Sequence, residues 1–168
     1  DMGKRLKVHH LIRSQFIPIT AEEAWPFFST PRNLEAITPK FLHFRILSEV
    51  PDEIYSGLII SYKIAAVFGI PMTWVTEIKH VTPLRAFVDE QRLGPFSFWF
   101  HEHRFKEVAG GIEMQDIVSY VMPLGWLGEI VHRLFIKRRL EAIFHFRRHF
   151  IEERWPLKSA SFEQQSHS

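Results

Sequence analysis

Two histidines separated by one residue, His101 and His103, are the side chains of this sequence best placed to do chemistry. They lie in the stretch Arg85–Phe105, which alternates polar and aromatic residues and is typical of two β-strands joined at Gly94-Pro95. Side chains alternate between the two faces of a strand, so both imidazoles share one face, about 6.5–7 Å apart along the strand. A sheet face that is both aromatic and ionisable indicates the wall of a pocket.

Carboxylates on the flanking strands could join the two histidines. Asp89 shares a face with Phe87 and Gln91, and Asp116 shares a face with Met114 and Tyr120. We expect Asp116 to point inward, where a carboxylate must be paired or protonated. Its partner could be a pocket histidine or one of three arginines of the same strands, namely Arg85, Arg92 and Arg104.

Three kinds of site could use these side chains. Two histidines with Asp89 or Asp116 form a recognised metal-ligand set. A His–Asp pair could instead act as general acid and base, with His101, His103 and Asp116 as the candidate catalytic residues. The third possibility is a structural hydrogen-bonded network. Two neighbouring histidines without cysteine are a weak metal signature, so the sequence favours polar anchors and predicts neither a metal nor a cofactor.

The composition narrows the class of protein. A chain of 168 residues fits one domain, and its 16 phenylalanines predict either a Phe-rich core or an incompletely filled apolar interior. A net charge of +2 with no clustered basic face argues against nucleic-acid binding. Cysteine is absent and no secretory leader is visible, so we expect a cytoplasmic protein. The longest apolar run, Ile64–Ile70, is far shorter than the ~20 residues of a membrane span.

Turn residues and hydrophobic periodicity predict the order strand, two short helices, six strands and one long helix. Thr20 is expected to cap the first short helix, Ala21–Ser29, and Thr30-Pro31 begins the second, which ends at Ile37. The strands are separated by Gly or Pro and are predicted over Val8–Ile17, Phe41–Ser48, Leu58–Val67, Met72–Val81, Arg85–Leu93, Ser97–Val108 and Ile112–Val121. Short connections make the sheet antiparallel, and the long helix Trp126–Trp155 covers its concave face. Residues 8–155 form the domain, 1–7 are a flexible segment or cloning remnant, and 156–168 a disordered tail.

The predicted long helix carries two apolar faces. Its first half has a face of four residues, which are Leu127, Ile130, Val131 and Leu134. The apolar side of its second half is rotated and comprises Ile136, Leu140, Ile143, Phe144 and Phe150. Either the helix rotates its buried face past the sheet edge, or the face with Phe144 and Phe150 contacts a second subunit. A homodimer through this helix is therefore one prediction. The basic clusters at 137–139 and 147–148 are interpreted as parts of a mixed-charge, solvated helix face.

The order of elements, together with seven segments, resembles the SRPBCC superfamily of START/Bet v 1-like proteins, which includes polyketide cyclases and coenzyme Q-binding proteins. A bacterial ligand-binding subgroup, some of whose members carry an epimerase-like domain and a cell-division-inhibitor label, is the most similar. The segments are Pro31–Pro39 (PRNLEAITP), Phe41–Leu47 (FLHFRIL), Ile70–Ile78 (IPMTWVTEI), Arg85–Phe96 (RAFVDEQRLGPF), Trp99–Phe105 (WFHEHRF), Gly110–Gly128 (GGIEMQDIVSYVMPLGWLG) and Phe135–Arg147 (FIKRRLEAIFHFR).

This resemblance implies an α+β helix-grip fold, in which a curved seven-stranded antiparallel sheet wraps around the long C-terminal helix. It also implies a cavity between sheet and helix that binds a small hydrophobic or amphipathic ligand such as a lipid, an isoprenoid or a polyketide. The expected ligand-contacting residues are Phe16, Tyr62, Trp74, Phe87, Asp89, Gln91, Trp99, His101, His103, Met114, Asp116, Tyr120, Leu127, Val131 and Leu134. No diagnostic catalytic motif distinguishes cyclases from binding proteins in this superfamily, and a binding protein is favoured over a cyclase- or hydrolase-type enzyme that uses a pocket histidine. A non-catalytic interaction module is the third reading.

Overall fold

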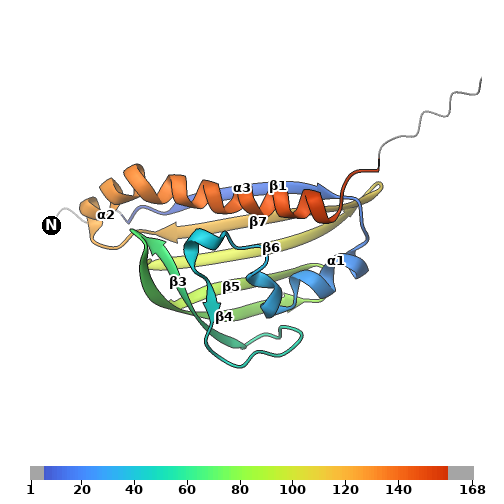
Figure 1. Cartoon of the computed structure of the whole chain (residues 1–168), viewed down its shortest axis with the longest axis horizontal. Coiled ribbons are helices and arrows are strands. Elements are labelled where there is room, and N and C mark those ends of the chain that lie inside the picture. The colour runs from blue at the N-terminus through green and yellow to red at the C-terminus, as the bar shows by residue number, and fades with distance from the viewer. Residues whose placement is uncertain (1–5, 159–168) are drawn as a thin grey trace, which may run out of the picture.

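The computed structural model describes residues 6–158, apart from the side chains of residues 66 and 67. Most of the predicted flexible segment (1–7) and of the predicted disordered tail (156–168) lies outside the described residues. The described residues form a seven-stranded antiparallel sheet in the order β1-β7-β6-β5-β4-β3-β2, with the C-terminal helix lying across it (Figure 1). The strands are β1 (His9–Ile17), β2 (Arg45–Ile46), β3 (Ile59–Val67), β4 (Ile70–Thr82), β5 (Ala86–Leu93), β6 (Phe98–Val108) and β7 (Gly111–Val121).

The helices also follow the predicted order. After β1 come α1 (Ala21–Phe28) and the 3-10 helices η1 (Pro31–Leu34) and η2 (Lys40–Leu42). The C-terminal helix has three parts, which are α2 (Gly125–Val131), a π-helical turn η3 (His132–Ile136) and α3 (Lys137–Arg154). This arrangement confirms the predicted helix-grip fold. No helix in the described part of the chain is long and apolar enough to cross a membrane.

Alternation along the strands decides which side chains face the helix. On β6, Trp99, His101, His103 and Phe105 are all buried, whereas Phe98 is 40% exposed on the outer face. This is the period-two pattern that the sequence predicts. Phe16 departs from the expectation, because the buried residues of β1 near it are Gln15 and Ile17 while Phe16 is 42% exposed. Phe16 therefore belongs to the outer face and the prediction that it lines the interior is wrong.

The segment between α1 and β3 differs most from its prediction. Thr20 does cap α1, in a capping box in which its side chain accepts from the Glu23 backbone N–H. The predicted strand Phe41–Ser48, however, is reduced to the two residues of β2. A left-handed backbone at His43, with φ of 48°, ends η2 and interrupts any extended run there. This segment instead contributes Leu42 and Phe44 to the core.

The π-helical turn explains why the apolar faces of the long helix do not line up. Its buried side consists of Gly128, His132, Ile136, Leu140, Phe144, Arg147 and Ile151. The first four spacings between these residues are all of four residues. In a helix of 3.6 residues per turn, side chains at this spacing would turn steadily away from the sheet. A π turn is wider and takes up the extra residues, so the same side stays buried.

This phase change overturns two predictions about the helix. Leu127 and Leu134 are 50% and 56% exposed, so neither faces the interior. Phe144 is buried, and Phe150 lies against Phe27 with ring centroids 6.0 Å apart. The face that was expected to contact a second subunit is thus covered by the protein's own core, while the homodimer itself remains a prediction.

Candidate functional site

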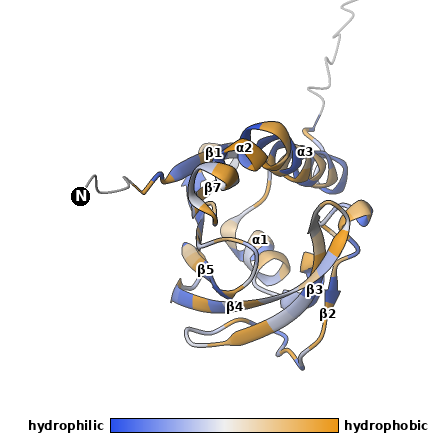
Figure 2. Ribbon diagram, turned by 90° about the vertical axis from the view of Figure 1, so that its left-hand side faces the viewer, coloured by the Kyte–Doolittle hydropathy of each residue, from blue (hydrophilic) through white to orange (hydrophobic). Residues whose placement is uncertain are grey.

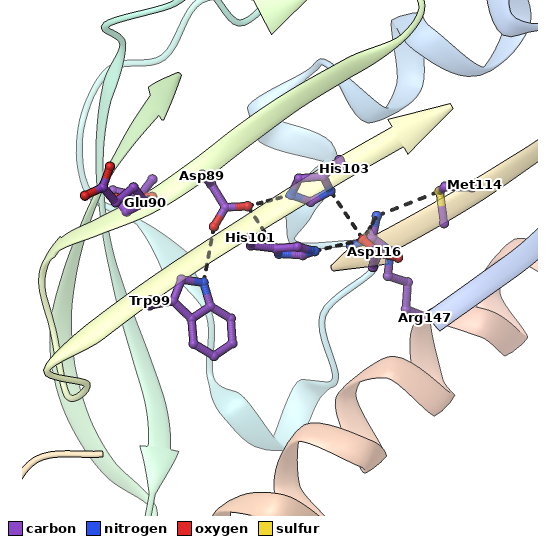
Figure 3. Close-up of polar contacts among 9 residues, drawn as sticks. Asp89, Glu90, Trp99, His101, His103, Met114, Asp116 and Arg147 are labelled. Carbon is purple, nitrogen blue, oxygen red and sulfur yellow. Dashed lines mark hydrogen bonds and ion pairs between the residues drawn. The ribbon is translucent and has the colours of Figure 1, made fainter. Parts of the chain in front are cut away.

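The two histidines of β6 lie between two aspartates from the neighbouring strands. The strand register places Asp89 of β5 opposite His101, and Asp116 of β7 opposite His103. All four side chains share the inner face of the sheet, as the period-two pattern predicts. Figure 3 shows the four side chains converging, while Glu90, the neighbour of Asp89, points away.

Each aspartate contacts both histidines, so the four side chains form a closed ring of polar contacts. His101 Nε2 lies 2.8 Å from Asp116 Oδ1, and His101 Nδ1 lies 3.3 Å from Asp89 Oδ2. His103 Nε2 lies 2.5 Å from Asp89 Oδ2, and the two imidazole rings stack with centroids 3.7 Å apart. On the other side, the His103 ring stacks on Phe87 at 4.1 Å. Trp99 Nε1 donates to Asp89 Oδ1 over 3.4 Å.

A fifth charged side chain, Arg147 of α3, completes the network from the helix side. Its Nη2 lies 3.4 Å from Asp116 Oδ1, and the side chain is only 8% exposed. The prediction that Arg147 belongs to a solvated basic cluster is wrong. The signal was its spacing, because Arg147 follows Leu140 and Phe144 and precedes Ile151 on one helical stripe. None of the three strand arginines proposed for Asp116 takes this role among the described residues.

The network divides the charges between its members. Burial opposes ionisation of Asp89 and Asp116, but the neighbouring cations outweigh it and hold both pKa values below the usual range. The cation that lowers the pKa of Asp89 is His101. The cations that lower the pKa of Asp116 are Arg147 and His101. Burial also disfavours the charged form of His101, but Asp89 and then Asp116 raise its pKa to about 9. At His103 burial and the adjacent charge of His101 lower the pKa to about 4.

These directions define the charge state at neutral pH. Both aspartates are ionised, His101 and Arg147 are cationic, and His103 is neutral, so the five side chains have no net charge. A neutral His103 donates from Nε2 to Asp89 and leaves a lone pair on Nδ1. That Nδ1 lies 3.4 Å from Asp116 Oδ1 and makes no hydrogen bond.

A cavity of about 180 Å³ lies between this network, the inner sheet face and α3. Its walls are mostly apolar and come from the segment after α1, from β3 to β6 and from α3. A larger pocket of about 520 Å³ lies on the other side of Asp116 and Arg147, but it is lined by polar groups of β1 and α3, among them Arg13, Glu141 and Arg148. The smaller cavity has the apolar walls and few polar groups that are typical of a site for an organic ligand.

Seven of the residues that the sequence predicts as ligand contacts line this cavity, and they are Tyr62, Trp74, Phe87, Asp89, Trp99, His101 and His103. Five further predicted contacts face inward but do not line the cavity, and they are Gln91, Met114, Asp116, Tyr120 and Val131. Residues that were not predicted as ligand contacts also line it, including Phe96, Ile136, Leu140 and Arg147. Phe96 comes from the turn before β6. The other three come from the C-terminal helix, and hydrophobic periodicity alone did not establish which side of that helix faces the sheet.

Two of the residues outside the cavity have structural partners instead. The Gln91 amide binds the turn between β5 and β6, donating to the Phe96 carbonyl at 2.7 Å and accepting from its N–H at 3.1 Å. The Tyr120 hydroxyl lies 2.7 Å from His132 Nε2, at the first residue of the π turn. Both contacts hold elements that surround the cavity.

Among the described residues, two groups of side chains bring potential metal-ligating atoms within 4.8 Å of one another, namely Asp89 with His101 and His103, and His9 with Glu129 and His132. In the first group Asp89 and Asp116 raise the pKa of His101 to about 9, so a metal would have to displace a firmly held proton. In the second, Glu129 already contacts His9 at 2.9 Å and Lys7 at 3.6 Å, and the lysine charge opposes a cation. Neither group fits a resident metal well.

Comparisons with known proteins agree with this architecture. The family model described as polyketide cyclase/dehydrase and lipid transport matches residues 17–144. No curated protein matches the chain. Solved structures with the same fold include protein Ms6760 from Mycobacterium smegmatis, at 15% identity and a TM-score of 0.61, with 86% of this chain and 92% of that chain covered. The di-domain ARO/CYC StfQ of the steffimycin biosynthetic pathway has 14% identity and a TM-score of 0.62, with 90% and 53% covered.

A third similar structure is the nucleoside-diphosphate sugar epimerase from Corynebacterium glutamicum, at 19% identity and a TM-score of 0.62. The match covers 85% of this chain but 28% of that one. At identities this low, the similarity shows a shared fold and does not extend the activities of those proteins to this chain.

Proposed function

The chain belongs to the polyketide cyclase/dehydrase and lipid transport family, and from this premise we propose that its cavity binds a small amphipathic molecule. The ligand has an apolar body and carries a neutral oxygen such as a ketone, ester or quinone carbonyl. Lipids, isoprenoids and polyketides all include molecules of this kind.

One observation carries the proposal. Three buried polar side-chain atoms lack a hydrogen-bond partner in the described part of the chain, and they are Trp74 Nε1, His103 Nδ1 and Arg147 Nε. All three residues line the same cavity. An unpaired buried polar group costs about 1–3 kcal/mol, so such groups in a native protein call for a partner. Trp74 and Arg147 present N–H donors, which an oxygen of the ligand would satisfy.

Charge and size further define the ligand. Because the network of two aspartates, His101 and Arg147 is already balanced, an anion placed beside it would face the Asp89 carboxylate without an unpaired cation of the network, and the further lining cation, Arg139, lies over the Phe41 ring. A neutral acceptor avoids this cost. A cavity of about 150 Å³ is known to hold benzene, so a cavity of about 180 Å³ accepts roughly one ring or a short chain.

The donor at Trp74 can be tested with two probes of nearly the same shape, acetophenone and ethylbenzene, which differ by one carbonyl oxygen. We expect wild type to bind acetophenone about two- to tenfold more tightly, the usual worth of one hydrogen bond. Trp74→Phe removes the free N–H and should reduce this preference, as measured by calorimetric titration. Trp99→Phe is the matched control, because the Trp99 N–H already donates to Asp89. Equal affinities in wild type, or an undiminished preference in Trp74→Phe, would contradict the proposal.

Native mass spectrometry of freshly purified protein provides an independent measurement. A bound small molecule that is released on mild denaturation supports the proposal, and its mass would identify the class of ligand.

A second candidate function, general acid–base catalysis, is favoured by the opposite protonation states of the stacked histidines. With pKa values of about 9 and about 4, His101 is an acid and His103 a base at neutral pH, and such a separation is typical of paired catalytic groups. His103 Nδ1 would accept a proton next to a carbonyl. We expect a bell-shaped pH–rate profile with a diketone substrate, lost in His103→Gln. Unchanged turnover when both histidines are alanine would exclude this function.

A further inference from the structure

An apolar surface lies at one end of the molecule, outside the cavity. It is formed by α2 and the residue before it, by the middle of η3 and by the turn between β3 and β4, and we call it the apolar end face. Its members are Leu124 (78% exposed), Trp126 (68%), Leu127 (50%), Ile130 (47%), Leu134 (56%), Phe135 (50%), Phe68 (60%) and Ile70 (57%). Phe68 and Phe135 contact each other with ring centroids 5.0 Å apart, which joins the turn to the helix. Figure 2 looks at this end of the molecule, where α2 faces the viewer and carries hydrophobic residues.

The exposure of these residues is not required by the core. Gly128, His132 and Ile136 already form the buried side of the same helix, so the leucines and Trp126 are a second apolar side. Single exposed hydrophobic residues are common, but a contiguous group of this size marks an interaction surface. A Cβ at Gly128 would lie 1.8 Å from the Pro123 carbonyl oxygen, so the helix packs closely here and keeps its outer side turned to solvent.

Positive charges border the apolar end face. Arg133, Lys137 and Arg138 are exposed, and within residues 6–158 none of them forms an ion pair. Glu129, the acid of α2, is engaged by His9 and Lys7. Arg133 follows Ile130 by three residues, and Lys137 and Arg138 follow Leu134 by three and four, so each cation adjoins an exposed apolar side chain. The surface therefore combines exposed apolar side chains, a tryptophan and unpaired cations.

We propose that the apolar end face docks the protein on an anionic lipid membrane. Interfacial helices combine a cationic rim with Trp, Leu and Phe that enter the boundary between headgroups and acyl chains, and anionic lipids attract the cations. A second copy of this chain fits less well, because a twofold contact centred here would bring the same cations together. The apolar end face also adjoins the cavity wall, since Phe135 and Arg138 directly precede the lining residues Ile136 and Arg139.

Docking can be measured by cosedimentation with vesicles, independently of any ligand. We expect binding to phosphatidylcholine vesicles that contain phosphatidylglycerol, and much weaker binding to phosphatidylcholine alone. Lys137→Gln/Arg138→Gln should weaken binding about 25-fold, at about fivefold per cation. Raising the salt concentration from ~0.1 M to ~1 M shortens the Debye length from about 10 Å to about 3 Å and should release the protein. Leu127→Gln/Leu134→Gln should weaken binding at least tenfold, because both side chains leave water on docking.

Matched substitutions elsewhere serve as controls. Leu157→Gln changes a leucine that is 71% exposed beyond the far end of α3, and Lys106→Gln removes an exposed cation from β6. Both should bind vesicles like wild type. All variants should keep the wild-type preference for acetophenone, because none of the substituted residues lines the cavity. The proposal would be overturned if the substitutions in the apolar end face and its cations left vesicle binding unchanged. It would also be overturned if wild type did not bind vesicles but formed a dimer in sedimentation that Leu127→Gln/Leu134→Gln dissociates.

Discussion

Arg147→Met is expected to lower the free energy of unfolding by about 3–5 kcal/mol at neutral pH, as measured by urea denaturation. The substitution keeps most of the side-chain volume but leaves Asp116 without the buried cation that lies 3.4 Å from it. Removing one partner of a buried ion pair has an effect of this size, because the buried network is then left with two carboxylates and a single cation, His101. Arg148→Met is the matched control at the next position. Its side chain is 51% exposed and pairs with Glu152 at the surface, so we expect a change of at most about 1 kcal/mol.

A double-mutant cycle shows whether the effect comes from charge. Asp116→Asn alone leaves Arg147 and His101 with one anion, Asp89, whereas Asp116→Asn together with Arg147→Met restores the balance. The double variant should therefore be more stable than either single variant. Additive losses would mean that Arg147 contributes through packing and not through its charge.

The second large effect is a pH dependence, in which the free energy of unfolding is greatest near pH 6.5. The histidine pair should lower it by about 3 kcal/mol as the pH rises to about 9, and by a similar amount as the pH falls to about 4. His101 has a folded-state pKa of about 9 against an ordinary value of 6.5, so above pH 6.5 the folded state holds a proton that the unfolded chain has lost. Its contribution is complete below pH 6.5 and disappears as the pH rises through about 9. One pKa unit corresponds to about 1.4 kcal/mol.

His103 has the opposite effect, on the acid side of the maximum. Its folded-state pKa of about 4 lies below 6.5, so as the pH falls from 6.5 the unfolded chain takes up a proton that the folded protein does not. Stability therefore decreases toward pH 4. Below that, protonation of Asp89 and Asp116, whose pKa values are lowered in the folded state, removes a further contribution.

Urea denaturation across pH 4 to 9 measures both slopes. His101→Gln/His103→Gln should remove both declines, whatever its effect on absolute stability; His101→Gln alone would leave His103 beside both aspartates without the charge that helps to lower its pKa. His149→Gln, which changes a histidine that is 60% exposed on α3, should keep both declines. A wild-type stability that stays flat from pH 6.5 to 9, or an unchanged alkaline slope in the double variant, would contradict the charge assignment.

Local sequence patterns were sufficient to predict most of the strands and the polar residues on the inner face of the sheet. Alternation along β5 to β7, with Gly and Pro at the turns, predicted that Asp89, His101, His103 and Asp116 share one face, and the register confirms it. The segment Phe41–Ser48 was predicted as a strand because its composition is apolar and aromatic. The left-handed residue His43 has no distinctive local signature, so that error could not be avoided from composition.

The polar residues of the inner face can be identified from local sequence alone, because the two-residue period of a strand requires no knowledge of distant contacts. Their charges and their surroundings depend on tertiary contacts. Arg147 lies 31 residues beyond Asp116, and the phase of the helix that brings them together depends on a π turn that a fixed 3.6-residue period cannot represent. The pKa values of the histidines likewise depend on burial and on neighbours from three strands and a helix. Those contacts exist only once the helix closes over the sheet.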